Sequence, residues 1–247
     1  MVIYILWLRQ LKRYFRSKSR ILTSLGQPLL FLVAFGFGFG PIFQKAGGGN
    51  YINFLAPGIV SMSVLFMSIF SGIEIIWDRQ FGFLKETLVA PVSRLEIMIG
   101  RTLGGATVAT MQGIIVSFVA MVAGFRISNW ALLPLAIVFM ALAAILFTAL
   151  GTAIASVLTD MQSFPLIMNF LVMPLFFLSG ALFPLAGLPK GLVIAATINP
   201  LSYAVDGLRG TLGGVAHFGL MTDFSVLVVA TGLVLWIGSF LFSKIEL

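Results

Sequence analysis

Apolar residues run through this chain in long, uninterrupted blocks rather than in short alternating runs. Six of these blocks reach the length of about 20 residues that an α-helix needs to cross a bilayer. They predict transmembrane helices at residues 21–43, 54–77, 102–125, 131–158, 163–185 and 224–242. We therefore expect an all-α integral membrane protein in which residues 1–247 form a single transmembrane domain.

The first 20 residues alternate in a different way, with a period close to that of an α-helix. Apolar side chains follow one helical face and arginines another: Ile3, Trp7, Leu11 and Phe15 on the first, and Arg9, Arg13, Arg16 and Arg20 on the second. This pattern predicts an amphipathic helix that lies in the membrane interface. A cleaved signal peptide is the alternative, but its apolar stretch would follow a long basic segment and continue as a full span. We therefore expect residues 1–20 to belong to the mature protein.

The distribution of cations predicts the topology. Six spans place both chain ends on one side of the membrane. If that side is the cytoplasm, eleven of the 15 Lys and Arg residues lie inside, and Lys45, Arg126, Lys190 and Arg209 lie outside. This is the asymmetry that the positive-inside rule describes, and the opposite orientation would invert it. We expect a multi-pass protein of the inner (plasma) membrane with both termini in the cytoplasm.

Residues 78–101 connect the second and third predicted spans on the cytoplasmic side. The segment mixes charged and apolar residues and contains a proline that ends any helix before it. The residues that we single out are Asp78, Arg79, Phe81, Phe83, Leu84, Lys85, Glu86 and Pro91. The pattern predicts a short helix, parallel to the membrane, that presents a mixed face to a cytosolic partner.

Residues 184–222 form an apolar connection that prolines and glycines interrupt too often for a full-length helix. Within it, Asn199 can cap a helix, Pro200 suits the first helical position, and Gly210 can end the helix after about half a bilayer. We predict a re-entrant helical hairpin on the external side, in which Asp206 and Arg209 neutralise each other. The alternative is a seventh span, which would send the C-terminus outside and place these charges at unfavourable depths.

Composition excludes several classes of protein. The chain is 60% hydrophobic and 9% charged, which excludes a soluble domain. It has no cysteine and one histidine, so disulfides and thiolate chemistry are excluded and we expect no metal site. Six of its 15 cations lie in residues 1–20, so the net charge of +7 indicates topology rather than nucleic-acid binding. The chain has no phosphate-binding GxxxxGK[ST] motif, so any ATP would be bound by another chain.

Few residues within the spans carry chemistry. Glu74 is the one acid inside a predicted span, and near a helix end it would reach the interface or pair with Arg79 or Arg101. The spans offer too few other ionisable groups for a proton-coupled carrier. An intramembrane serine hydrolase using Ser179 is disfavoured, because the single histidine lies in the external connection.

Two segments resemble a known family. They are LKETLVAPVSR at 84–94, and FFLSGALFPL at 176–185 followed by INPLSYAVDGLRG at 198–210, with Pro200, Leu201, Tyr203 and Arg209 at the characteristic spacing. The chain is similar over nearly its whole length to the membrane subunits of ABC type-2 transporters, the branch with bacterial drug, antibiotic and lipo-oligosaccharide exporters.

The resemblance implies a six-span permease that is not itself an enzyme and has no cofactor of its own. It implies a homodimer, or a pair with a similar chain, and two cytosolic ATPase subunits that bind ATP and Mg²⁺. The N-terminal helix and residues 78–91 would transmit ATPase closure, and the hairpin with Asn199, Pro200, Tyr203, Asp206 and Arg209 would form an external gate. The substrate would be amphiphilic, such as a drug, a lipid or a glycolipid. A passive channel or an ATP-independent carrier is the alternative, although we find no rings of charge typical of a channel.

Overall fold

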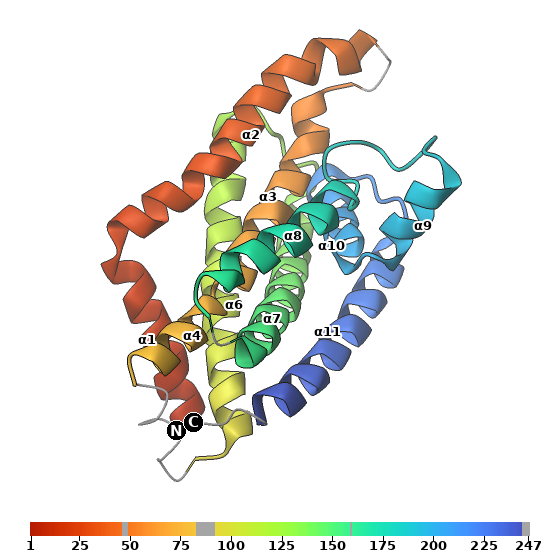
Figure 1. Cartoon of the computed structure of the whole chain (residues 1–247). Coiled ribbons are helices and arrows are strands. Elements are labelled where there is room, and N and C mark those ends of the chain that lie inside the picture. Colours follow the sequence, from red (N-terminus) through yellow and green to blue (C-terminus); the bar gives the residue numbers. More distant parts are fainter. Residues whose placement is uncertain (46–48, 83–91, 159, 244–247) are drawn as a thin grey trace.

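A computed structural model describes residues 1–45, 49–82, 92–158 and 160–243, with the side chain of Arg20 outside this description. The described residues form helices and their connections (Figure 1). In chain order the helices are α1 (Val2–Arg16), α2 (Lys18–Lys45), α3 (Tyr51–Phe70), α4 (Ile73–Gln80), α6 (Arg94–Val122), a 3₁₀ turn η1 (Trp130–Leu132), α7 (Leu133–Val157), α8 (Ser163–Phe177), α9 (Lys190–Ile198), α10 (Pro200–Leu208), a π-helical turn η2 (Arg209–Gly213) and α11 (Leu220–Ser243).

The described helices confirm the predicted all-α membrane fold. Five are long and apolar enough to cross a bilayer: 21–45, 51–80, 94–122, 130–157 and 220–243. The second of these combines α3 with α4. The pair 190–198 and 200–213 meets the same criterion together but is bent by 86°, as a broken span or a re-entrant hairpin would be. The interruption at Asn199 and Pro200 agrees with the half-helices expected from the sequence.

The span predicted at 163–185 is shorter than expected. Helix α8 has 15 residues and ends at Phe177, after which the chain turns up to Pro189. Pro174 lies in its last turn, and Gly180 adopts a positive φ of 73°, which an α-helix cannot contain. The apolar residues after Phe177 therefore form a largely buried turn and do not extend the helix.

Helix α3 lies at the centre of the fold. In its most apolar window 72% of residues are buried, against 17% for α2 and for α11, so the latter two are peripheral. Helices α3 and α7 approach so closely that glycine is required at their crossing. A Cβ atom at Gly72 would lie 2.4 Å from the carbonyl oxygen of Gly151, and one at Gly151 would lie 2.4 Å from that of Ile69. The backbones there are in direct contact.

Helix α1 packs along the first half of α6. The glycines Gly100 and Gly104, one helical turn apart, let it approach: a Cβ at Gly100 would lie 3.1 Å from Ile3 Cα, and one at Gly104 would lie 2.7 Å from Gln10 Cγ. Trp7 Nε1 donates a hydrogen bond to Thr107 Oγ1 at 3.0 Å. The amphipathic helix ends at Arg16 rather than at residue 20, so Arg20 belongs to α2. Its position in a membrane interface remains a prediction.

The helices run between two ends of the bundle. The start of α1 and the end of α11 lie at one end, which we call the terminus end (Figure 1). The end of α2 and the connection after α6 lie at the other, which we call the opposite end. There, Asn53 Oδ1 accepts a hydrogen bond from Arg126 N, and Leu212 O accepts one from Ser128 N. Among the described cations, Arg126 thus lies at the opposite end, whereas Arg94 donates a hydrogen bond to Ser243 O at the end of α11.

Candidate functional site

Asp78 joins three helices at the terminus end. It is the last acid of α4, and its carboxylate lies between two arginines from different helices. Arg9 Nη2 of α1 lies 3.0 Å from Oδ1, and Arg101 Nη2 of α6 lies 2.6 Å from Oδ2. Arg101 is 4% exposed, whereas the side chain of Arg9 is 33% exposed. The carboxylate therefore couples a buried cation of the bundle to a partly exposed cation of the N-terminal helix.

Glu74 adds a second link between the same helices. It lies one turn before Asp78 on α4 and is 4% exposed. Arg13 Nη1 of α1 lies 3.5 Å from Oε2, and the Arg13 guanidinium lies 5.4 Å from the centre of the Trp77 ring. The sequence suggested Arg79 or Arg101 as partners; the contact at 3.5 Å is with Arg13, and Glu74 also attracts Arg101 electrostatically. The sequence could not place α1 beside α4, because nothing in its local pattern specifies that contact.

Arg79 instead holds the end of α7. Its Nη1 donates to Leu158 O at 3.1 Å and its Nη2 to Ser156 O at 2.9 Å. These carbonyls close a helix C-terminus, where a cation also interacts favourably with the helix dipole. Asp78 and Arg79, adjacent in sequence, therefore connect α4 to α1 and α6 on one side and to α7 on the other. A displacement of α4 would act on all three helices.

A basic groove of about 1110 Å³ borders this cluster. Its lining contains five cations and one acid: Ile5, Leu8, Arg9, Lys12, Arg13, Arg16, Ser17, Lys18, Ser19, Trp77, Asp78 and Phe81. The groove lies between α1 and the end of α4. Such an excess of cations in a concave surface attracts anionic groups of a partner or of a membrane.

Part of the predicted coupling segment lies outside the described residues: Phe83, Leu84, Lys85, Glu86 and Pro91. Just before these residues, the side chain of Phe81 is 81% exposed. Shortly after them, Ser93 begins α6 with a capping box, in which Glu96 N donates to the Ser93 hydroxyl and Ser93 N donates to the Glu96 carboxylate. Residues 94–101, assigned to the loop from the sequence, therefore form the first two turns of α6.

At the opposite end, Asn199 connects α9, α10 and α8. Its side-chain oxygen accepts from Leu201 N at 3.0 Å, as predicted for a cap of the helix that Pro200 begins. Its Nδ2 donates to Leu175 O at 2.6 Å. The Tyr203 hydroxyl donates to Thr197 O at 2.8 Å and ties α10 back to α9. One amide thus fixes the bend between the two half-helices and attaches it to α8.

Asp206 and Arg209 attract each other electrostatically, but their hydrogen bonds go to other groups. Asp206, 3% exposed, accepts hydrogen bonds from the backbone N–H groups of His217, at 2.8 Å, and Phe218, at 2.7 Å. Arg209 Nη2 donates to Gly180 O at 2.9 Å, and its guanidinium lies 4.0 Å from the centre of the Phe54 ring. Asp206 thus holds the connection after η2, and Arg209 holds the turn after α8.

Those of the singled-out residues that the structure describes thus form two separate groups, one around Asp78 and one around the α9–α10 hairpin. Comparison with known proteins gives both groups a context: residues 1–212 match the model of the ABC-2 type transporter family. The chain belongs to that family. Its members are transport permeases that work with ATP-binding partners, so this chain is a multi-span membrane permease and not itself an enzyme.

Individual relatives cover most of the chain. Nodulation protein J of Rhizobium leguminosarum bv. viciae is 27% identical over 225 residues, which are 87% of this chain and 86% of the relative. The inner membrane transport permease YadH of Escherichia coli K12 is 27% identical over 227 residues, 91% of this chain and 88% of the relative. The protein ycf38 of Porphyra purpurea is 31% identical over 204 residues, 78% and 68% of the two chains.

The sequence did not reveal the roles of two buried polar residues, Arg101 and Gln112. Arg101 was considered as a topological cation and as a possible partner of Glu74, but not as the buried partner of Asp78. Gln112 was not considered, although it is 1% exposed and accepts a hydrogen bond from the Tyr14 hydroxyl at 2.8 Å. An amide in the middle of an otherwise apolar span was the available signal, because such a group requires partners in a bilayer.

Proposed function

We propose that this permease is the membrane subunit of an ATP-driven exporter for an amphiphilic substrate such as a drug, a lipid or a glycolipid. Two cytosolic ATPase subunits would bind ATP and Mg²⁺ and drive it, and a second permease copy, as a homodimer, would complete the pathway. The protein would lie in the inner membrane, with both termini in the cytoplasm. The name of the relative YadH, an inner membrane transport permease, supports that location.

The observation that carries the proposal is the Arg9–Asp78–Arg101 cluster. A permease without an ATP site must receive force from another protein, and the force must reach the spans. Asp78, the first residue of the predicted coupling segment, connects the partly exposed helix α1 to the buried Arg101 of α6. A partner that pushed on α1 or on residues 78–91 would therefore act on α4, α6 and, through Arg79, on α7.

The charge of the terminus end supports the assigned orientation and partner. The basic groove beside Asp78 offers a surface for acidic groups of an ATPase subunit. In this arrangement ATP binding would bring the two ATPases together and close the cytoplasmic side. The hairpin of α9 and α10 at the opposite end would form the external gate.

The first test is purification of the full chain from its native membrane under mild conditions. The proposal expects a stoichiometric soluble subunit with a phosphate-binding loop, and an ATPase activity that an amphiphilic substrate stimulates. Reversing both charges at Lys85 and Glu86 should weaken or uncouple that complex while the permease remains folded. A chain that purifies alone in a well-behaved preparation would instead favour a passive channel or an ATP-independent carrier.

A further inference from the structure

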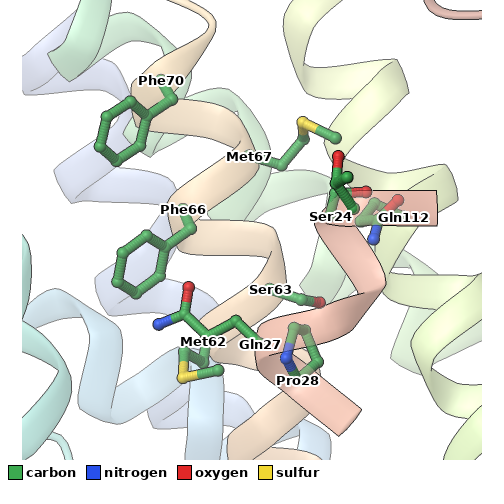
Figure 2. Close-up of a pocket in the computed structure, with 10 residues that line it drawn as sticks. Ser24, Gln27, Pro28, Met62, Ser63, Phe66, Met67, Phe70 and Gln112 are labelled. Carbon is green, nitrogen blue, oxygen red and sulfur yellow. The ribbon is translucent and has the colours of Figure 1, made fainter. Parts of the chain in front are cut away.

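A cavity of about 260 Å³ lies between α2 and α3, with α6 behind it (Figure 2). Its lining comes from three of the predicted spans: Thr23, Ser24, Gln27 and Pro28 of α2, Met62, Ser63, Phe66, Met67 and Phe70 of α3, and Gln112 of α6. All of these residues belong to helices that are long and apolar enough to cross the bilayer. The cavity therefore lies within the membrane-spanning part of the bundle, in the half nearer the terminus end.

Gln112 gives this cavity an unused hydrogen-bond donor. The residue is 1% exposed, and its side-chain oxygen accepts from the Tyr14 hydroxyl at 2.8 Å. Its Nε2 has no hydrogen-bond partner within the described part of the chain. A buried amide N–H without a partner is unfavourable, and more so where no bulk water is near. A ligand that accepts a hydrogen bond here would remove that penalty.

Acceptors lie on the walls beside Gln112. The hydroxyls of Ser24 and Ser63 donate to carbonyls of their own helices, Ile21 O and Val60 O, both at 2.8 Å, so their oxygen lone pairs remain available. Pro28 lies inside α2 and has no N–H, so the Ser24 carbonyl lacks its usual helical donor. Figure 2 shows Ser24 and Gln112 on the same side of α3. The cavity thus offers both donors and acceptors within a small volume.

The residues that line this cavity are uncharged. None of its ten residues is ionisable. A charged group brought into such a site would be desolvated without a counter-charge, which is costly. An uncharged group with several hydroxyls or amides would instead exchange its hydrogen bonds with water for bonds with the protein. The walls therefore select against phosphate, carboxylate and ammonium groups.

The remaining wall suits an apolar chain. Phe66 and Phe70 are partly exposed, stacked with ring centres 6.2 Å apart, and project on the other side of α3 in Figure 2. Phe70 also contacts Phe164 of α8, with ring centres 6.3 Å apart. The apolar surface thus continues from the cavity toward α8. The volume is close to the lower limit of small-molecule pockets, about 300 Å³, which suits a compact head group better than a whole amphiphile.

We propose that this cavity binds the uncharged, hydrogen-bonding head group of an amphiphile, whose apolar chain lies along Phe66 and Phe70. The inference rests on the proposed export function and gives its substrate a chemical class. The same chemistry is available from a transported molecule and from a resident bilayer lipid with a sugar or glycerol head. The test below separates these two sources.

The probe is dodecyl glucoside with a photoreactive diazirine in its tail, compared with dodecyl phosphate and dodecyl trimethylammonium that carry the same tail. The full chain, with its ATPase subunit where the two copurify, is placed in nanodiscs of phosphatidylethanolamine and phosphatidylglycerol. We expect the glucoside to label α3 peptides around Met62–Phe70 at least tenfold more than either charged probe. Excess unlabelled dodecyl glucoside should compete. Equal labelling by all three probes, or labelling confined to other helices, would overturn the proposal.

Variants test the polar contacts. Gln112→Leu should reduce glucoside labelling about five- to tenfold, the equivalent of one lost hydrogen bond. Because this change also removes the acceptor of Tyr14, Ser63→Ala provides a second variant that leaves that contact intact and should reduce labelling about threefold. Thr110→Ala is the matched control: its hydroxyl also bonds to its own helix, at Ala106 O, but it does not line the cavity. Labelling unchanged in both Gln112→Leu and Ser63→Ala would exclude the proposed site.

Turnover identifies the source of the head group. If the ligand is transported, ATP and Mg²⁺ should lower labelling of the unmodified protein, and dodecyl glucoside should stimulate its ATPase less in Gln112→Leu. If the ligand is a resident lipid, labelling should be unaffected by ATP and a neutral lipid should remain bound in native mass spectrometry. Head-group selectivity can be measured on the chain alone. The binding site can therefore be confirmed even if no ATPase partner is found, and it can be excluded even if one is found.

Discussion

Arg101 Nη2 lies 2.6 Å from Asp78 Oδ2, and this buried contact joins α6 to α4. The arginine is 4% exposed, and its Nε and Nη1 have no hydrogen-bond partner among the described residues. Asp78 is therefore the acid that makes this buried cation tolerable. The same carboxylate holds Arg9 of α1, so its stabilising role and its proposed coupling role are linked.

Replacing Asp78 with leucine should destabilise the protein strongly, because it leaves Arg101 buried without its acid. Breaking a buried pair in this way costs about 3–5 kcal/mol. Arg9→Ala should cost less than about 1 kcal/mol, because that partner is substantially exposed. The double variant Asp78→Leu with Arg101→Leu should recover much of the loss. Thermal unfolding in detergent measures these variants together with the single variant Arg101→Leu, and a double variant as unstable as the sum of its two single variants would contradict this account.

The sequence predicted the membrane-spanning helices because their signal is local: about 20 apolar residues in succession require a bilayer whatever packs beside them. It also predicted the bend at Asn199 and Pro200, where a cap and a proline act within one turn. It failed where partners are distant in sequence. Glu74 pairs with Arg13, and Asp206 holds the backbone at His217, because tertiary folding brings these segments together. It also overextended α8, because apolar composition does not reveal where a buried turn begins.

The crossing of α3 and α7 should tolerate no side chain at its centre. A Cβ at Gly151 would lie 2.4 Å from the carbonyl oxygen of Ile69, and backbone cannot move aside as a flexible side chain can. We expect Gly151→Ala to lower stability by more than about 3 kcal/mol and to reduce the amount of folded protein in the membrane. Size-exclusion chromatography and thermal unfolding provide the measurement.

Gly38→Ala is the control for that change. Gly38 lies inside α2 with nothing within 4 Å of a built Cβ, so alanine there should be neutral or stabilising by about 1 kcal/mol. If both substitutions behave alike, the close α3–α7 contact is not the reason for the glycine at 151.

Asp160 should give the start of α8 a pH-dependent stability. A hydrogen bond from the Ser163 hydroxyl at 2.6 Å, together with backbone N–H groups of Gln162 and Ser163, holds the pKa of its carboxyl below the ordinary value of 3.8. A lowered pKa in the folded state means that the contribution is fully present above 3.8 and is lost as pH falls through the folded value. The difference in Tm between the unmodified protein and Asp160→Ala should therefore shrink below that pH. Asp160→Asn keeps an acceptor without a charge, and its difference from alanine should not vary with pH.

The proposed orientation can be tested with single cysteines, because the chain contains none of its own. A cysteine at Lys190, at the start of α9, should react with an impermeant maleimide added to intact cells. One at Phe81, which is 81% exposed at the terminus end, should react only after the membrane is opened. The reverse pattern would invert the topology and place the basic groove outside.

Arg209 should stabilise the opposite end through the planar geometry of its guanidinium group as well as through its charge. Its guanidinium lies 4.0 Å from the centre of the Phe54 ring and donates to Gly180 O at 2.9 Å, so one planar group joins η2 to α3 and to the turn after α8. A charge-assisted hydrogen bond contributes about 1.5–3 kcal/mol and a cation–π contact about 0.5–2 kcal/mol. We expect Arg209→Met to lower the free energy of unfolding by about 2–4 kcal/mol.

Arg209→Lys separates this explanation from the ion pair that the sequence suggested. Lysine keeps the positive charge three residues from Asp206 but cannot stack a planar group on Phe54 while it donates to Gly180. If the stacked geometry dominates, lysine should restore less than about half of the loss caused by methionine. If attraction to Asp206 dominates, lysine should restore most of it. Arg126→Met, which removes an exposed cation from the same end without such contacts, should leave unfolding in detergent unchanged and shows that the effect is not one of net charge.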